Sequence, residues 1–136
     1  MKDSNCIFCK IANGEIPSKT IEENGMFRVV LDVGPATKGH ALILPKDHYS
    51  NLYELPEEVA AEALKLAKKV ALKMKERLHC DGVNLVQNNE EAAGQTVFHF
   101  HMHVIPRYEG GPEMVTWTPG KDEEMAATAE AIKGAL

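Results

Sequence analysis

The segment FHFHMHVIPR, residues 98–107, alternates histidines with large apolar residues, and this alternation limits the fold more than any other feature of the chain. Its apolar residues are aromatic, β-branched or long, which favours a strand. Successive side chains of a strand point to opposite faces, so His99, His101 and His103 should share one face. The residues between them should line the other face and pack in a core: Phe100, Met102 and Val104.

The spacing of the three histidines limits how they can act together. Same-face neighbours on a strand lie about 6.6 Å apart, which is too far for a direct hydrogen bond between rings in ideal geometry. A ligand with several oxygen atoms could bridge that gap. Pro106 should end the strand, because it has no N–H to donate to a ladder.

Length and charge set the class of protein. The 136 residues, 44% of them hydrophobic, predict a single globular domain over 1–136 with a real core. No apolar run is long enough to span a membrane, and the polar start MKDSNCIFCK lacks a signal region, so we expect a cytoplasmic protein without a membrane partner. The net charge of -5, without a basic block, argues against a nucleic-acid partner but allows a small phosphorylated ligand.

Two strands near the N-terminus are predicted to form a hairpin. Lys19–Glu22 and Phe27–Leu31 flank Asn24-Gly25, a pair typical of a type I′ turn. Further strands are predicted at His40–Pro45, at Gly82–Asn89 and in the histidine segment. The last two are joined by a short polar turn and should pair antiparallel.

One long helix is predicted over residues 55–78, with Pro56 in its first turn and Gly82 as its stop. Its buried face repeats every three or four residues: Val59, Ala63, Leu66, Val70, Met74 and Leu78. After a stretch rich in glycine and proline, Tyr108–Gly120, a short helix is expected over about Asp122–Ile132. These elements predict an α+β domain with a mostly antiparallel sheet, one long helix and a short C-terminal helix.

The residues of the histidine segment admit three interpretations. The histidines can simply lie on a solvated face. His-x-His on a strand can also be a ligand pair for zinc. Finally, a neutral imidazole can attack a phosphorus atom, provided that one ring nitrogen is held as a donor so that the other presents its lone pair. His101, flanked by two imidazoles, is best placed for that role.

The turn before the histidines carries small residues with accessible backbone N–H groups. Gly94, Gln95 and Thr96 can bind phosphate oxygens, and the Thr96 hydroxyl can donate a proton to a leaving group. The alternative is an ordinary glycine-containing turn.

The cysteines suggest a metal rather than a disulfide scaffold. Cys6-x-x-Cys9 is half a zinc site, and three cysteines are too few for a disulfide framework. Two more ligands are needed, and an unmetallated pair is the alternative. His79 and Cys80 are competing ligands of lower rank, because they lie at the far end of the long helix.

The chain resembles the histidine triad (HIT) family of nucleotide hydrolases and transferases. HFHMHVI has the family's His-x-His-x-His-x-x pattern, and CIFCKIANGEIPSKTIEEN, LDVGPATKGHALILPKDH and LVQNNEEAAGQTVFHFHMHVIPR resemble its segments in order over residues 5–108. Within the family, the chain is most similar to purine nucleoside phosphoramidases and their bacterial relatives. The resemblance implies a HIT-like fold.

The resemblance also implies roles for single residues. His101 matches the nucleophile, which forms a nucleotidyl-histidine intermediate, and His99 and His103 match its partners. His40 matches a histidine near the phosphate. Asp32 matches the acid that binds the ribose hydroxyls, although it can also be a turn-initiating residue before VGP.

Further positions match the substrate pocket of the family. The phosphate and leaving-group contacts match Asn88, Gln95 and Thr96, next to Gly94, and the walls of the base pocket match Phe8, Ile11, Phe27 and Leu31. Trp117 lies in the C-terminal segment that, in the family, reaches the active site of the other subunit of a homodimer. The segment GGPEMVTWTPG departs from the family's tails in detail, and a packed surface aromatic is the alternative for Trp117.

Bacterial relatives of this kind hold a structural zinc, which the resemblance assigns here to Cys6, Cys9, His48 and His99. This set suits tetrahedral zinc and leaves His101 and His103 for chemistry that needs no cofactor.

The expected activity is hydrolysis of a purine nucleoside 5′-phosphoramidate or related conjugate to the nucleoside monophosphate. His103 at the third triad position favours hydrolysis, because a transferase branch has glutamine there. The alternatives are a dinucleoside polyphosphate hydrolase, a nucleotide- or partner-binding module with incidental activity, and a histidine-rich metal protein with all three histidines on metal.

Overall fold

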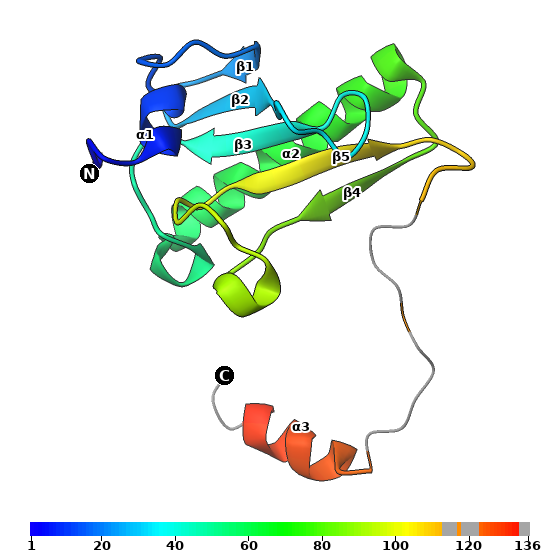
Figure 1. The fold of residues 1–136 in the computed structure, drawn as a ribbon. Coiled ribbons are helices and arrows are strands. Elements are labelled where there is room, and N and C mark those ends of the chain that lie inside the picture. The colour runs from blue at the N-terminus through cyan, green and yellow to red at the C-terminus, as the bar shows by residue number, and fades with distance from the viewer. Residues whose placement is uncertain (113–116, 118–122, 134–136) are drawn as a thin grey trace.

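The computed structural model describes residues 1–112, 117 and 123–133 and shows a five-stranded sheet with a helix on each face (Figure 1). The strands are β1 Thr20–Glu23, β2 Phe27–Leu31, β3 Ala41–Pro45, β4 Gly82–Val86 and β5 Met102–Arg107. They are all antiparallel, in the order β1-β2-β3-β5-β4. The helices are α1 Ile7–Ala12, α2 Glu57–Leu78 and α3 Met125–Lys133, with short 3-10 turns at Leu52–Glu54 and Glu91–Ala93. The predicted α+β architecture is confirmed.

The hairpin β1-β2 forms as predicted, but its turn is not of type I′. That turn requires positive φ at both central residues, and neither Asn24 nor Gly25 has one. Instead, the side-chain oxygen of Asn24 accepts hydrogen bonds from the N–H groups of Met26 (2.9 Å) and Phe27 (2.7 Å). A side-chain acceptor therefore closes this turn.

Helix α2 buries the predicted face but ends differently. Leu78, the sixth predicted residue, is partly buried and packs against the same core. The other five are buried: Val59, Ala63, Leu66, Val70 and Met74. His79, in the left-handed conformation (φ 55°), ends the helix, three residues before the expected stop at Gly82. Lys75 Nζ donates to the Cys80 carbonyl at 2.9 Å and so ties the residue after the cap back to the last turn of the helix.

Strand β5 is shorter at its start and longer at its end than predicted. It begins at Met102, so His99 and His101 precede the ladder, and it includes Pro106. Pairing with β3 reaches only Val104, so Pro106 has a strand on one side only, as at a sheet edge, where proline is tolerated. The neighbouring β4 also ends earlier than predicted, at Val86.

The two faces of the histidine segment separate as predicted. Phe100, Met102 and Val104 pack against the core under α2. His103 lies opposite Leu42 of β3 in register, and Leu42 packs in the smaller cluster under α1. The histidines therefore lie on the face of the sheet that α1 covers, which we call the α1 face.

The C-terminal part of the chain leaves the sheet after β5 (Figure 1). Every residue of α3 is exposed, and this helix matches the predicted C-terminal helix apart from its bounds. The expected start of that helix at Asp122 and most of the expected loop after Pro112 lie outside the described residues. In the part of the chain that the structure describes, no helix is long and apolar enough to cross a membrane.

Candidate active site

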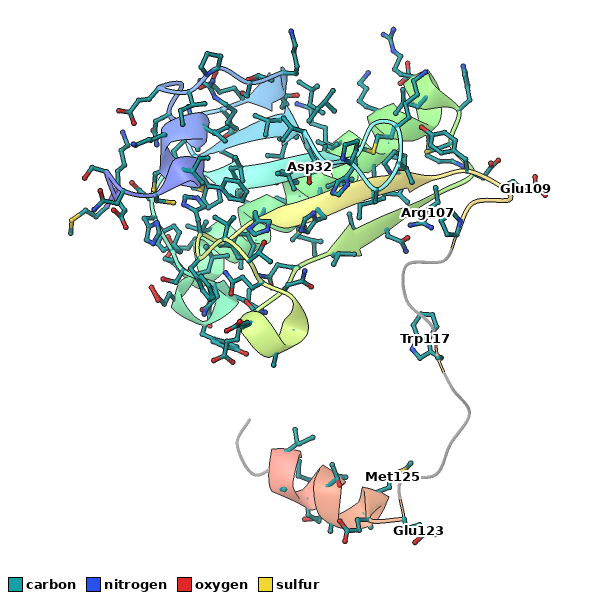
Figure 2. The ribbon with its side chains drawn as sticks, in the orientation of Figure 1. Asp32, Arg107, Glu109, Trp117, Glu123 and Met125 are labelled. Atoms are coloured by element: carbon teal, nitrogen blue, oxygen red, sulfur yellow. The ribbon has the colours of Figure 1, made fainter. Side chains whose placement is uncertain are left out.

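The candidate active site lies on the α1 face, where the β2–β3 connection meets the β4–β5 connection and the start of β5. His40 immediately precedes β3, His103 lies in β5 and His101 lies just before it. Asp32, which is labelled in Figure 2, follows β2. His101 and His103 have ring centroids 5.0 Å apart, and His40 and His103 have centroids 5.1 Å apart. Three imidazoles and one carboxylate thus form one group.

His101 is held as a neutral ring with one nitrogen free. Its Nδ1 lies 2.7 Å from the His99 carbonyl oxygen. Because a carbonyl can only accept, Nδ1 carries the proton and Nε2 keeps its lone pair. Burial lowers the pKa of His101, against the opposing effects of the His99 carbonyl and the Asp32 carboxylate. Nε2 is therefore unprotonated at neutral pH, and its lone pair is available for attack on an electrophile.

His40 and His103 are joined by a hydrogen bond whose direction the backbone sets. The Ala36 N–H donates to His40 Nδ1 at 2.9 Å, so the proton of His40 lies on Nε2. That nitrogen lies 2.9 Å from His103 Nδ1 and donates to it, which leaves the proton of His103 on its Nε2. The pair therefore offers an N–H group to a ligand.

Both rings of this pair are neutral. Burial lowers the pKa of His40. Burial, with the neighbouring His101 and His40, lowers the pKa of His103 to about 4. The Asp32 carboxylate, whose Oδ2 lies 3.6 Å from His40 Nε2, raises the pKa of His40, but burial outweighs it.

Asp32 fits both of its predicted interpretations. Its Oδ1 accepts from the Gly34 N–H at 2.8 Å, as a turn-initiating residue does. Its Oδ2 faces the histidine pair and is not tied to the turn. One carboxylate oxygen thus orders the loop and the other is available to a ligand.

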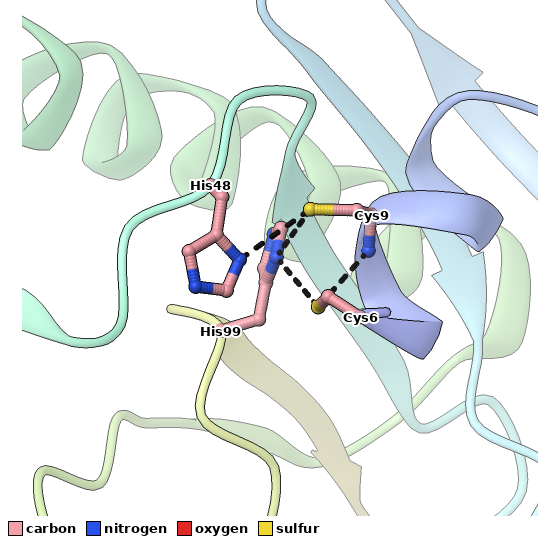
Figure 3. A group of neighbouring side chains, drawn as sticks. All are labelled: Cys6, Cys9, His48 and His99. Atoms are coloured by element: carbon pink, nitrogen blue, oxygen red, sulfur yellow. Dashed lines mark hydrogen bonds between the residues drawn. The ribbon is translucent and has the colours of Figure 1, made fainter. Parts of the chain in front are cut away.

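A second group of side chains lies beside the first and is drawn in Figure 3. Cys6 and Cys9 come from the start of α1, His48 from the loop after β3, and His99 from the segment before β5. Their ligand atoms all lie within 4.8 Å of one another. His99 Nδ1 lies 3.4 Å from both sulfur atoms, and His48 Nδ1 lies 3.4 Å from Cys9 Sγ.

The hydrogen bonds around this group direct lone pairs toward its centre. His99 Nε2 lies 2.9 Å from the Pro45 carbonyl and must donate to it, so His99 Nδ1 is the unprotonated nitrogen. The Asp3 N–H donates to Cys9 Sγ (3.4 Å), and the Cys9 N–H donates to Cys6 Sγ (3.3 Å). Burial raises the pKa of the Cys9 thiol, so a cation is needed to keep it ionised.

This group fits a tetrahedral zinc ion. Zn–S and Zn–N bonds of about 2.3 and 2.0–2.1 Å place sulfur and nitrogen ligands about 3.6 Å apart, close to the observed 3.4 Å. His79 and Cys80, the competing ligands, do not join this group among the described residues. Nor do the three histidines converge on one ion, because only His99 belongs to it.

The turn before the histidines has a different internal structure from the one expected. Gln95 is buried, and its side chain bonds to the backbone of Glu90 (2.7 Å), Ser50 (2.7 Å) and Val97 (3.1 Å). Both amide protons of Gln95 are thus used within the chain, and its side chain braces the turn. Thr96 beside it is exposed.

Gly94 and Asn88 lie close together at this turn. Gly94 has φ 96°, and a Cβ there would lie 3.8 Å from Asn88 Nδ2. The turn therefore needs a glycine at this position for its backbone conformation.

Two of the four residues expected around a base lie on the α1 face. Phe8 has its ring centroid 4.9 Å from that of His101, and Ile11 packs in the cluster under α1. Phe27 is instead fully buried in the core under α2, and Leu31 lines a cavity with Val70 of α2. Phe27 and Leu31 are therefore not brought to the histidines, because their positions in β2 point to the other face.

Trp117 is not near the site within one chain. It is 83% exposed and lies away from the sheet (Figure 2). It is thus not a packed aromatic of this chain either.

The functional groups that sequence reasoning missed are backbone atoms. The Ala36 N–H and the carbonyls of Pro45 and His99 determine which ring nitrogen of each histidine is protonated. No side-chain pattern could have revealed them, since every residue carries a carbonyl.

The chain is similar in sequence to known proteins. A sequence model of the HIT domain matches residues 13–110. A HIT-like protein of Methanocaldococcus jannaschii is 43% identical over 129 residues, covering 95% of this chain and 99% of the relative. An adenosine 5′-monophosphoramidase of Schizosaccharomyces pombe is 38% identical over 138 residues, covering 97% of this chain and 98% of the enzyme.

Solved structures extend the likeness to the fold. A HIT family member from Bacillus subtilis superposes with a TM-score of 0.89 at 38% identity, covering 98% of each chain. A zinc-bound histidine triad family protein from Mycobacterium smegmatis superposes with a TM-score of 0.76 at 36% identity, covering 96% of this chain and 97% of the other.

Proposed function

This chain belongs to the HIT domain family, and from that membership we propose that it is a hydrolase of purine nucleoside 5′-phosphoramidates or related conjugates. Relatives named as adenosine 5′-monophosphoramidases support nucleotide hydrolysis as the reaction class. The observation that carries the proposal is the hydrogen bond from His101 Nδ1 to the His99 carbonyl, which leaves Nε2 as a buried, unprotonated nucleophile.

The first half of the reaction forms a nucleotidyl-histidine. His101 Nε2 attacks the α-phosphorus, the N–P bond forms, and the P–N bond to the leaving amine breaks. The ring then bears a positive charge, which the His99 carbonyl stabilises through Nδ1–H. The departing amine takes a proton, for which the Thr96 hydroxyl or the His103 N–H is the donor.

The second half releases the nucleoside monophosphate. Water attacks the phosphorus, the bond to His101 breaks, and a proton of the water returns to the group that gave one to the amine. The His40–His103 pair holds an N–H toward the phosphate oxygens, where negative charge develops. The free oxygen of Asp32 binds the ribose hydroxyls.

The substrate contacts divide between side chains and backbone. Phe8 and Ile11 line the base side of the site, while the Thr96 N–H binds phosphate. The N–H groups of Gly94 (2.9 Å) and Gln95 (3.1 Å) instead donate to the carbonyls of Glu91 and Glu90 within the turn. Gln95 acts through the turn that it braces.

Cys6, Cys9, His48 and His99 would hold a zinc ion, about one per chain. The ion would ionise the two thiols and tie α1 to the catalytic segment, and the phosphoryl chemistry would need no other cofactor. The donor set and the zinc-bound relative support this assignment. The unbridged cysteines suit a reducing compartment, which supports a cytoplasmic location.

We also propose a homodimer in which Trp117 of one subunit reaches the active site of the other. The exposure of Trp117 and of α3 supports this arrangement, because neither is covered within one chain.

The proposal is tested by AMP release from adenosine 5′-phosphoramidate. The wild-type chain should turn over, and His101→Ala should lose activity by about a thousandfold or more while still binding AMP. Turnover that survives in His101→Ala would exclude His101 as the nucleophile. AMP binding without turnover by the wild type would favour a binding module, and cleavage of diadenosine polyphosphates alone would favour the dinucleoside polyphosphate hydrolase.

A further inference from the structure

The segment that carries the nucleophile has little regular backbone support. His99 and His101 precede the ladder of β5, and between them the Phe100 N–H donates to the Tyr49 carbonyl at 2.6 Å. The position of the His99 carbonyl, which orients His101, therefore depends strongly on what holds the His99 side chain.

The side chain of His99 is held at both ring nitrogens. Nε2 donates to the Pro45 carbonyl, and Nδ1 faces Cys6 and Cys9 at 3.4 Å. His48 packs against the same ring, with centroids 5.2 Å apart. A ring held at both nitrogens cannot turn without breaking one of these contacts, so its position is tied to that of its own backbone.

A second connection runs through α1. Phe8 lies between the two cysteines in sequence and packs edge-on against His101 at 4.9 Å and against His99 at 6.1 Å. Helix α1 has only six residues, too few for stability of its own, so the cysteines at its start hold Phe8 against the nucleophile.

We propose that Cys6, Cys9 and His48 are positioning residues for the nucleophile, acting on His101 through the His99 backbone and through Phe8. This proposal rests on the proposed function and deepens it. It assigns to the metal-binding group a role in orienting the reactive ring in addition to stapling the N-terminus to the sheet. These three residues therefore help to orient His101 Nε2 without contacting the substrate.

The test uses His48→Asn in the full chain, because His48 contacts Cys9 and His99 and has no assigned role in binding substrate. We expect the single-turnover rate of AMP transfer to His101 to fall by about tenfold to a hundredfold, with the KM changed less than the kcat. The Nδ1–H proton of His101, bonded to a buried carbonyl, should give a slowly exchanging NMR signal that is lost in His48→Asn and in chelator-treated wild type.

Two further variants separate positioning from general stability. His48→Cys offers a ligand of the right kind and should restore both the metal and the NMR signal. Cys80→Ser removes a buried thiol outside the group and should change neither. Circular dichroism verifies that each variant is folded at the assay temperature. If His48→Asn is not folded, the chelator-treated wild type takes its place as the metal-free protein.

Retention of the His101 Nδ1–H signal and of the single-turnover rate in folded, metal-free protein would overturn the proposal. Loss of the signal in metal-loaded His48→Cys would do the same, since the ligands would then not suffice to position the ring. The NMR readout needs no substrate. A wild-type chain that shows the metal-dependent signal but no turnover would therefore contradict the proposed function and leave the positioning role supported.

Discussion

Two neighbouring groups in this protein each contain two histidines, but their hydrogen bonds suit them to different ligands. Cys6, Cys9, His48 and His99 form one, and Asp32, His40 and His103 form the other, each with ligand atoms within 4.8 Å of one another. We call them the thiol group and the carboxylate group. Proximity alone would make both metal sites.

The backbone partner of one ring nitrogen distinguishes them. In the thiol group a carbonyl, that of Pro45, accepts from His99 Nε2, so a lone pair faces inward. In the carboxylate group an N–H, that of Ala36, donates to His40 Nδ1, so an N–H faces inward. A metal needs lone pairs, whereas a phosphate needs N–H donors. The partner of the second ring nitrogen therefore decides which ligand a histidine cluster can take.

The largest effect should follow from breaking the thiol group. Cys9→Ser removes a ligand that contacts both histidines, so bound zinc should fall from about one equivalent to none, and stability should fall by several kcal/mol. Metal analysis and thermal unfolding measure both. Cys80→Ser is the matched control and should keep the zinc. Loss of zinc in this variant as well would show that the thiol group is not the zinc site.

A smaller effect is expected from breaking the carboxylate group. His40→Asn removes the donor to His103 Nδ1, and kcat should fall by about a hundredfold to ten-thousandfold. Zinc content should stay the same, because His40 is outside the thiol group. A variant that lost zinc while keeping its kcat would reverse the assignment of the two groups.

The pH dependence of stability should report the neutral carboxylate group. The pKa of His103 is about 4 in the folded chain and about 6.5 when unfolded, so the unfolded state binds the extra proton between these values. The contribution of neutral His103 to the free energy of unfolding is therefore present above about pH 6.5 and declines as the pH falls toward 4.

Between pH 6.5 and pH 5, His103 alone should reduce the free energy of unfolding by about 2 kcal/mol. Denaturant unfolding at several pH values gives the slope of the free energy of unfolding against pH, and the wild type should have a steeper slope than His103→Gln. Equal slopes would show that His103 is not held neutral. Activity should fall in the same direction, because protonation of His101 removes its lone pair and burial only lowers the pKa at which this happens.

The smallest effect should follow from removing one hydrogen-bond donor, the Ala36 N–H that bonds His40 Nδ1. Ala36→Pro removes the N–H that bonds His40 Nδ1, whereas Ala36→Gly keeps it. We expect about a tenfold lower kcat in the proline variant only, with a new weak affinity for zinc as His40 Nε2 becomes free to present a lone pair. Titration of both variants with zinc checks this; identical titrations would leave the Ala36 N–H without a role.

Much of the fold could be predicted because side-chain patterns determine it. The alternation around Phe100, His101 and Met102 placed apolar and imidazole groups on opposite faces, and the repeat from Val59 to Met74 placed the buried face of α2. The bounds of β5 could not be predicted, because its end at Arg107 depends on pairing with Gly82 of β4 beyond the last pair with β3.

The site was predictable in composition but not in detail. The resemblance brought the four residues of the thiol group together, and the structure places them within reach of one ion. The side of the sheet that Phe27 faces was not predicted, because it depends on the register of β2. The internal bonds of Gln95 were not predicted either, because they need the loop at Ser50. The protonated nitrogen of each ring depends on backbone atoms brought together only by folding.

The central claim is that His101 Nε2 is the nucleophile. The most direct measurement is a rapid alkaline quench of the enzyme in mid-reaction with adenosine 5′-phosphoramidate, followed by peptide mass spectrometry at neutral or basic pH, because acid would cleave the P–N bond of the adduct. An adenylyl group on His101, absent from His101→Ala, is the predicted result. An adenylyl group on His99 or His103, or turnover at full rate with no adduct in the rapid-quench samples, would contradict it.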